Sequence, residues 1–306
     1  MKYRRLGQTE LKVSVVGLGT WQFGGEWGKD FTQSEVDDML ALAKELGINF
    51  IDTAECYGDH LSESLIGQSI ARERGDWVIA TKFGHKYSGH ASRVQLWSPS
   101  DVLQQLEDSL RALQTDYIDI YQFHSGSDGS FDQDDLWTLL DKQVLAGKIR
   151  HLGISLGNND NLHQTNKASD IHAKVIQVVY NRIDQKPEER VFPSCISQDL
   201  GVLARVPLAS GFLSGKYQPT ASFDQNDVRG KRPAELIASQ LQQVEEIKQK
   251  EVPAGIDMAQ WALAWCLQHP AVTSVIPGCK NIEQVELNAK AADLDVVSLK
   301  HPSAWE

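Results

Sequence analysis

Short apolar runs alternate with longer amphipathic segments along nearly the whole chain, and this alternation limits the possible folds more than any other feature. The apolar runs are too short for helices, whereas the segments between them repeat apolar residues at helical spacing. Residues 32–46 are one example, with Val36 and Leu40 on one face and Gly47 directly after the helix. Eight such alternations in one series favour a closed parallel (β/α)8 barrel over a doubly wound sheet.

The alternating pattern assigns most of the residues to strands or helices. The strands of the predicted barrel are residues 15–19, 50–52, 78–82, 117–123, 149–155, 175–180, 202–206 and 273–276. The predicted helices are residues 32–46, 62–70, 99–113, 133–146, 159–167, 188–199, 233–250, 257–268 and 282–291, so there are extra helices near the C-terminus. A turn-rich tetrad at residues 7–10 predicts a small N-terminal hairpin. The long segment 212–232 is predicted to be a mobile loop and a lid over the strand ends.

Length and charge narrow the class of protein. The 306 residues could hold two domains, but no Pro/Ser-rich linker interrupts the series and barrels of ~250 residues fold as one, so we expect one domain over residues 1–306. The net charge of −11 argues against nucleic acid or an anionic membrane as a partner. The four cysteines are dispersed, and no signal peptide or membrane-spanning run is evident. We therefore expect a cytoplasmic protein that acts on a small molecule, as a monomer or homo-oligomer.

Two strand ends deliver a carboxylate, a phenol and an amine to one face. Asp52 ends one apolar run, Tyr57 follows in the next loop, and Lys82 ends the following run. A phenol is a poor acid at neutral pH, and a nearby ammonium lowers its pKa. Tyr57 is then a proton donor, Lys82 adjusts the pKa of its phenol, and Asp52 orients Lys82. Taken alone, Asp52 could equally cap the turn after its strand.

The motifs Phe-Ile-Asp-Thr-Ala at residues 50–54, Tyr-Gly at 57–58, Thr-Lys at 81–82 and Tyr-Gln-Phe-His at 121–124 closely resemble those of the aldo-keto reductases. The resemblance extends over almost the whole chain and places the family's four catalytic residues on Asp52, Tyr57, Lys82 and His124. It implies reduction of an aldehyde or ketone, with His124 orienting the carbonyl group. A lone His after a strand is otherwise more often structural.

Two Gly-containing loops are candidates for a phosphate site. Residues 207–216 are small and Gly-rich and end in Lys216, and residues 277–281 lead into a helix N-terminus, where an anion is favoured. Barrels bind phosphates with the loops after strands seven and eight. The G-x-G-x-x-G pattern of a Rossmann fold is absent, since residues 17–22 lack the third Gly.

The resemblance implies that these loops bind NADP(H), with NAD(H) as the alternative cofactor. The residues that it places against the cofactor are Gly19, Thr20, Trp21, Ser155, Gln177, Pro207, Leu208, Ser210, Gly211, Leu213, Gly215, Lys216, Gly278, Lys280, Gln284 and Asn288. Lys280 is expected to be the only cation near the ribose phosphate, because Gln284 stands where many relatives have Arg. Lys280, Gln284 and Asn288 could also be an ordinary solvated helix start.

The chain departs from the family pattern at three positions. Arg205 stands where many members have a Tyr that stacks on the nicotinamide, Leu156 replaces an Asn, and Leu287 replaces a Glu near the adenine. The substrate pocket is expected to include Trp21 and Trp27, although both could be core residues. Aromatic walls fit a carbonyl compound on an apolar or sugar-like body.

Two other functions remain open. Some relatives serve as cofactor-binding regulatory subunits of membrane channels. A metal-dependent barrel hydrolase would need His and Asp ligands at strand ends. Only His124 lies at a predicted strand end, whereas His60, His85 and His90 fall in predicted loops without ligand-like spacing, so no metal is expected.

Overall fold

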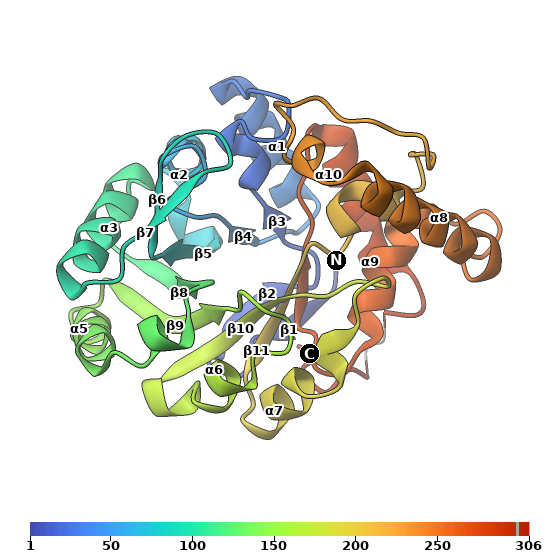
Figure 1. Ribbon diagram of the computed structural model, residues 1–306. Coiled ribbons are helices and arrows are strands. Elements are labelled where there is room, and N and C mark those ends of the chain that lie inside the picture. The colour runs from blue at the N-terminus through green and yellow to red at the C-terminus, as the bar shows by residue number, and fades with distance from the viewer. Residues whose placement is uncertain (298–299, 306) are drawn as a thin grey trace.

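The computed structural model describes residues 1–297 and 300–305, and in this part of the chain the strands and helices form a barrel (Figure 1). Eight strands lie in one sheet in the order β3-β4-β5-β8-β9-β10-β11-β12, and all neighbours are parallel. Parallel bridges from Val16 to Val275 and from Gly19 to Gly278 connect its two edges. The predicted (β/α)8 barrel is confirmed.

The helices surround this sheet in Figure 1, and the elements follow the predicted order. The strands are β1 (Tyr3–Arg5), β2 (Lys12–Ser14), β3 (Leu18–Gly19), β4 (Phe50–Asp52), β5 (Val78–Phe83), β6 (His85–Tyr87), β7 (Arg93–Gln95), β8 (Ile118–His124), β9 (Ile149–Ser155), β10 (Ala173–Val179), β11 (Gly201–Arg205) and β12 (Ser274–Ile276). The α-helices are α1 (Gln33–Glu45), α2 (Leu61–Ile70), α3 (Pro99–Ala112), α4 (Asp128–Phe131), α5 (Asp134–Leu145), α6 (Leu162–Asn166), α7 (Val191–Ser197), α8 (Ala234–Lys250), α9 (Met258–Gln268) and α10 (Ile282–Ala289). The 3-10 helices are η1 (Trp21–Gly24), η2 (Arg74–Asp76), η3 (Ser169–Ile171), η4 (Lys186–Glu188), η5 (Ala209–Ser214), η6 (Val228–Lys231) and η7 (Lys290–Asp293).

Local sequence explains where the helices begin. Thr32 caps α1 by accepting a hydrogen bond from the Glu35 amide, and the Glu35 carboxylate accepts one from the Thr32 amide in return. Ser98 caps α3 in the same position, and Pro99 fills the first helical position, where no backbone N–H is needed. These start signals were readable in the sequence.

The sequence did not reveal the hairpin β6–β7, which lies over one side of the barrel mouth. Its two strands pair in antiparallel register from His85 to Gln95 and carry mostly polar or exposed residues. An apolar-run criterion does not detect such strands, because they cover no core of their own. The hairpin becomes important because it forms part of the wall of the site described below.

The opposite end of the barrel is closed by the hairpin β1–β2. Leu6 and Val13, both fully buried, pack against barrel side chains that include Phe50, Ile120 and Leu203. Gly7 (φ +51°) touches the backbone of Gly201 so closely that a Cβ there would lie 2.2 Å from its nitrogen. The hairpin therefore blocks access from this end and leaves the carboxyl ends of the strands as the open face.

One buried arginine ties β1 to the last part of the barrel. Arg4 is 1% exposed, and its guanidinium donates hydrogen bonds to the carbonyls of Val272 (2.5 Å) and Leu267 (2.9 Å). The Trp305 amide also donates to the Tyr3 carbonyl, at 2.9 Å. Residues near the two ends of the described chain are thus bonded side by side.

No helix in residues 1–297 and 300–305 combines the length and the hydrophobicity needed to span a bilayer.

Candidate active site

Several polar side chains meet where the parallel strands end. Asp52 is the last residue of β4 and His124 the last residue of β8, while Lys82 lies one residue before the end of β5. The register pairs Lys82 with Gln122 and His124 with Ser155, so these ends lie at one level. The structure therefore brings together the strand-end residues that the sequence singled out.

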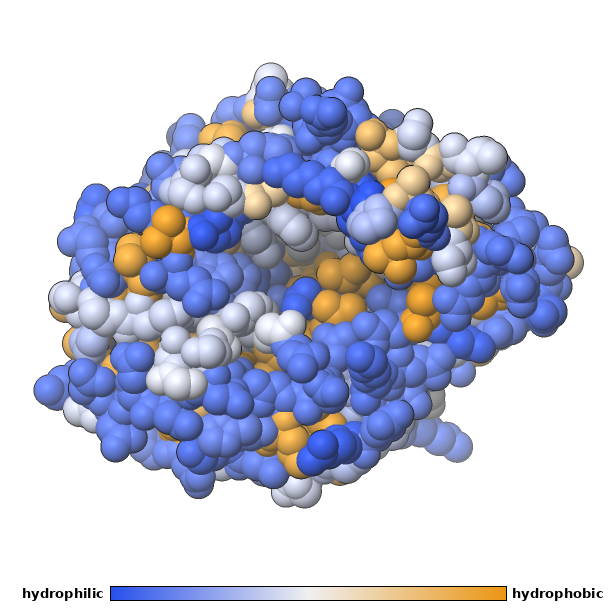
Figure 2. Space-filling view, viewed as in Figure 1, coloured by the Kyte–Doolittle hydropathy of each residue, from blue (hydrophilic) through white to orange (hydrophobic). Residues whose placement is uncertain are grey.

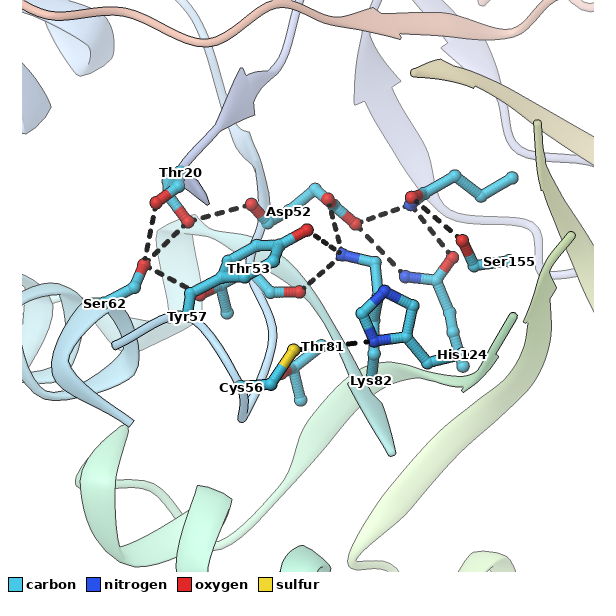
Figure 3. A network of polar contacts seen from close by, with 12 residues as sticks. Thr20, Asp52, Thr53, Cys56, Tyr57, Ser62, Thr81, Lys82, His124 and Ser155 are labelled. Atoms are coloured by element: carbon cyan, nitrogen blue, oxygen red, sulfur yellow. Dashed lines mark hydrogen bonds and ion pairs between the residues drawn. The ribbon is translucent and has the colours of Figure 1, made fainter. Parts of the chain in front are cut away.

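The Lys82 ammonium is the centre of this cluster (Figure 3). It donates to the Asp52 carboxylate (Oδ2, 2.8 Å) and to the Thr53 carbonyl (2.7 Å). A third contact, of 3.3 Å, joins its Nζ to the Tyr57 phenol oxygen. Burial alone would lower the pKa of Lys82, but Asp52 and Tyr57 outweigh it and raise the pKa above the usual value. Lys82 is therefore a fully buried, charged group with each of its three N–H bonds engaged.

The second oxygen of Asp52 is held by two side-chain amides from other strands of the barrel. Its Oδ1 accepts hydrogen bonds from Gln177 (2.6 Å) and Gln122 (3.1 Å). Gln177 also accepts a hydrogen bond from the Ser155 hydroxyl, at 3.3 Å. Gln122 was not predicted, although a polar residue two positions before His124 in an apolar strand points to the same face and could have been found by this alternation. The carboxylate is thus held by side chains from β8 and β10, in addition to Lys82 from β5.

The electrostatics of Tyr57 differ from the sequence-based expectation. Burial is the largest influence and raises the pKa of Tyr57 to about 12, whereas Lys82 acts in the opposite direction. The expected lowering by Lys82 is present, but the burial of the phenolate and the charge of Asp52 outweigh it. The phenol consequently keeps its proton at neutral pH, as a proton donor must.

His124 lies across the cluster from Lys82. Its ring is perpendicular to that of Tyr57, with centroids 6.4 Å apart, and its Nδ1 lies 3.9 Å from the Cys56 sulfur. Enclosure by the protein and then the charge of Lys82 hold the pKa of His124 well below its usual value. The imidazole is therefore neutral and offers one N–H donor and one acceptor nitrogen.

A buried carboxylate that the sequence did not reveal organises the rim. Glu26, 1% exposed, accepts hydrogen bonds from the Trp21 indole (2.6 Å) and the Ala91 amide (2.6 Å), and it pairs with Arg93. Trp21 in turn stacks over Tyr57, with ring centroids 5.9 Å apart. Glu26 thus fixes both the indole beside Tyr57 and the hairpin β6–β7. It has no strand-end pattern, which is why the sequence gave no signal for it.

These groups line one end of a cavity of about 660 Å³, and Figure 2 shows the same face hollowed near its centre. The catalytic candidates Asp52, Tyr57 and His124 line it, as do most of the residues expected to contact a cofactor: Gly19, Thr20, Trp21, Gln177, Pro207, Leu208, Ser210, Gly211, Lys216, Gly278, Lys280, Gln284 and Asn288. Three expected residues do not line it. Ser155 lies behind Gln177, Leu213 is buried in the core beside α8 and α9, and Gly215 (φ +71°) faces Met258.

The far end of the cavity carries three cations. Lys216, Arg229 and Lys280 all line it, so Lys280 is not the only cation at the cavity; that Lys280 alone contacts the ribose phosphate stays a prediction. Arg229 is buried and bonded to Asp227 (2.6 Å), and Lys280 contacts the Trp27 carbonyl and lies 3.8 Å from Asp227. Arg229 comes from the long loop that follows η5, far from α10 in the sequence, and Asp227 of the same loop links it to Lys280.

The departures from the expected pattern also lie at the cavity. Arg205 and Leu287 both line it. The Arg205 guanidinium donates to the Leu156 carbonyl at 3.0 Å, while its Nε is buried without a hydrogen-bond partner. Gln284 accepts a hydrogen bond from the Lys280 amide (2.9 Å), which fixes the start of α10. Arg205 therefore contributes a planar cation to this wall.

Residues 15–302 match the family model described as the aldo/keto reductase family. The chain belongs to this family. The uncharacterized oxidoreductase YqkF of Bacillus subtilis is 33% identical over 297 residues, which cover 96% of this chain and 92% of that protein. The holo form of aldo-keto reductase AKR11C1 from Bacillus halodurans superposes with a TM-score of 0.81 and 28% identity, over 98% of this chain and 94% of that one.

Two further relatives differ in what their names describe. The NADH-specific methylglyoxal reductase of Escherichia coli is 29% identical over 97% of this chain and 95% of its own length. A probable voltage-gated potassium channel subunit beta of Arabidopsis thaliana is 28% identical over 96% of this chain and 92% of its own length. As a member of the family, the chain is an oxidoreductase, and the family uses nicotinamide cofactors.

Proposed function

We propose that this aldo-keto reductase reduces an aldehyde or ketone to an alcohol with NADP(H), and that Tyr57 donates the proton. The observation that carries the proposal is the 3.3 Å contact between the Tyr57 phenol and the Lys82 ammonium, which Asp52 holds in place. A protonated phenol next to a fixed cation can release its proton because the ammonium stabilises the phenolate that forms. No other phenol lines the cavity at this end within the described residues.

The residues around the cavity fit a nicotinamide dinucleotide. Lys216, Arg229 and Lys280 supply positive charge for phosphates at one end, and the catalytic candidates lie at the other. The bound cofactor supplies the hydride that adds to the carbonyl carbon. Arg205 lies between these ends, in the wall where the resemblance puts the nicotinamide.

The remaining chemistry belongs to the chain. The neutral His124 imidazole donates its N–H to the carbonyl oxygen and fixes the orientation of the substrate, as Tyr57 approaches the same oxygen. As negative charge develops there, the Tyr57 proton moves to it and the alcohol forms. Lys82 stabilises the resulting phenolate, which regains a proton from water. Trp21, stacked beside Tyr57, and the Glu26-bound hairpin limit the access of water to this step.

The preference for NADP(H) over NAD(H) depends on the cations at the far end. Lys280 and Arg229 favour the additional phosphate, although Asp227 compensates part of their charge. The NADH-specific methylglyoxal reductase shows that members of comparable similarity differ in cofactor. The aromatic walls made by Trp21 and Trp27 suit an apolar or sugar-derived carbonyl compound.

A role as a cofactor-binding regulatory subunit is the second candidate, favoured by the similarity to plant potassium channel β subunits. The complete proton-donating cluster supports the enzyme instead. The test is to follow the oxidation of NADPH and NADH spectroscopically with a panel of aldehydes and ketones, and to identify the alcohol formed. Tight binding of a cofactor without turnover of any carbonyl compound would favour the regulatory subunit.

A further inference from the structure

Cys56, His85 and His124 come from three separate elements and meet at the catalytic end of the cavity. Cys56 lies in the loop after β4, His85 begins β6, and His124 ends β8. One ligand atom of each residue, a sulfur or a ring nitrogen, lies within 4.8 Å of the other two. Their positions in the sequence gave no hint of this, because the hairpin that carries His85 was not predicted.

The donor atoms of the three residues have few partners within the protein, and the Cys56 sulfur interacts with Arg93 as well as with His124. His85 Nε2 is buried without a hydrogen-bond partner. The Cys56 thiol is 2% exposed, and its contact with His124 Nδ1 is long, at 3.9 Å. The dashed line between sulfur and ring nitrogen in Figure 3 marks this contact. A buried ring nitrogen left without a partner is uncommon and calls for a ligand.

We propose that Cys56, His85 and His124 form a binding site for a divalent zinc ion. Thiolate sulfur and imidazole nitrogen are the preferred ligands of Zn²⁺, and three protein ligands leave a fourth position for water or another oxygen. Cys56 and His124 line the cavity, so this fourth position faces the space in which a carbonyl substrate binds.

Binding requires a modest closing of the three side chains. Tetrahedral zinc with bonds of about 2.0–2.3 Å holds its donor atoms about 3.3–3.6 Å apart. The His85 and His124 rings are now stacked at 24°, with centroids 4.5 Å apart, so one ring must rotate to point its lone pair at the ion. His85 lies on the partly exposed hairpin β6–β7 and is the ring free to do so. Its amide already donates to the buried Glu55 carboxyl at 2.9 Å, which holds its backbone in place.

Neighbouring cations do not prevent binding, because each has its own carboxylate. Lys82 is paired with Asp52, and Arg93 is paired with Glu26. On binding, the Cys56 thiol gives up its proton to solvent as its sulfur coordinates the ion. The thiolate then contributes one negative charge to the site.

Zinc would occupy His124 and the space of the carbonyl oxygen, so it would inhibit reduction in competition with the substrate. This consequence depends on the function proposed above, whereas the binding itself does not. The expected inhibition is reversible by a chelator.

Calorimetric titration of the full-length protein, freed of metal with a chelator, tests the site directly. We expect one Zn²⁺ per chain with release of one proton, and with Co²⁺ a sulfur-to-metal charge-transfer band in the near ultraviolet. Cys56→Ser should remove the band and weaken Zn²⁺ binding by about a hundred-fold or more, and His85→Gln should weaken it similarly, since each removes a ligand. His90→Gln, a nearby histidine in the same hairpin, is the control and should leave binding unchanged.

Binding that Cys56→Ser leaves intact, or the lack of any one-to-one binding, would overturn the site. Should His85→Gln fail to fold, the Cys56→Ser titration and the cobalt band still decide. One-to-one binding through Cys56 in a protein that reduces no carbonyl compound would support the site and overturn the proposed function.

Discussion

The two ends of the cavity are built in different ways. At the catalytic end, Asp52 and Lys82 are buried on adjacent strands, and every N–H bond of Lys82 has an acceptor inside the protein. At the far end, the cations come from loops and a helix start, and the side chain of Lys280 is 30% exposed. The barrel thus fixes the geometry of the proposed proton-donating groups, whereas loops carry the cations that we propose recognise the cofactor. One end should be intolerant of substitution and the other adjustable.

Removing the Tyr57 hydroxyl should have the largest effect. In Tyr57→Phe we expect turnover of a test aldehyde to fall by about 10²–10⁴-fold, because the proton donor is lost. Cofactor affinity should change little, as measured by quenching of tryptophan fluorescence. Tyr121→Phe is the control, since its buried hydroxyl has no hydrogen-bond partner. Near-normal turnover in Tyr57→Phe would contradict the assignment of the donor.

Removing the cation of the buried Lys82–Asp52 ion pair should cost more stability than removing a cation at the other end of the cavity. Lys82→Met leaves the Asp52 carboxylate without its cation, and the free energy of unfolding should drop by about 3–5 kcal/mol. Lys280→Met at the other end removes a partly exposed cation and should cost no more than about 1 kcal/mol. Urea unfolding of both variants measures the difference. An equal drop in the free energy of unfolding for both variants would contradict the difference between the two ends.

The pH dependence of stability tests how completely water is excluded from the catalytic end. Burial raises the pKa of Glu55, in the loop between Asp52 and Tyr57, to about 8. The unfolded chain loses this proton from about pH 4.5 and the folded chain only near pH 8, so stability falls as pH rises between the two. The slope is about 1.4 kcal/mol per pH unit at most.

Glu55→Gln should flatten this slope in thermal or urea unfolding between pH 4.5 and 8. Glu35→Gln is the control, because the Thr32 amide holds the pKa of that carboxyl at about 2, below the tested range. A wild-type protein whose stability is constant over this range would show that water or a counter-charge reaches Glu55.

The smallest effect is expected from cofactor choice. One charge-assisted contact to the ribose phosphate is worth about 1.5–3 kcal/mol, or about ten- to a hundred-fold in affinity. We expect NADPH to bind more tightly than NADH by that margin, and Lys280→Ala to remove part of it because Arg229 remains. Titration of both cofactors measures the ratio. Tighter binding of NADH by the wild type would refute the NADP(H) assignment and leave the reductase proposal standing.

The sequence predicted the parts that follow from periodicity and strand ends. The barrel and the strand-end positions of Asp52 and Lys82 follow from apolar runs that end in polar residues, the N-terminal hairpin follows from a turn-rich tetrad, and His124 was singled out by the family resemblance. These predictions succeeded because each depends on neighbours in the chain or on the common level of parallel strand ends.

Contacts between distant segments were not predictable in this way. Glu26 is important because the hairpin β6–β7 folds back onto it. The pKa of Tyr57 also depends on how completely the fold excludes water, which no local pattern encodes. The sequence therefore identified the candidate catalytic residues better than the surrounding groups that set their orientation and pKa values.

The bonds of Arg4 have a consequence for the order of events during synthesis. A ribosome makes β1 long before the acceptors of Arg4 at Leu267 and Val272 and the Trp305 amide that bonds to Tyr3. The plug at the base of the barrel cannot acquire these partners before then, and a buried cation without acceptors is costly. A nascent chain that stops short of residue 267 would leave Arg4 without either of its carbonyl acceptors, so the base of the barrel can be completed only after these residues have been made.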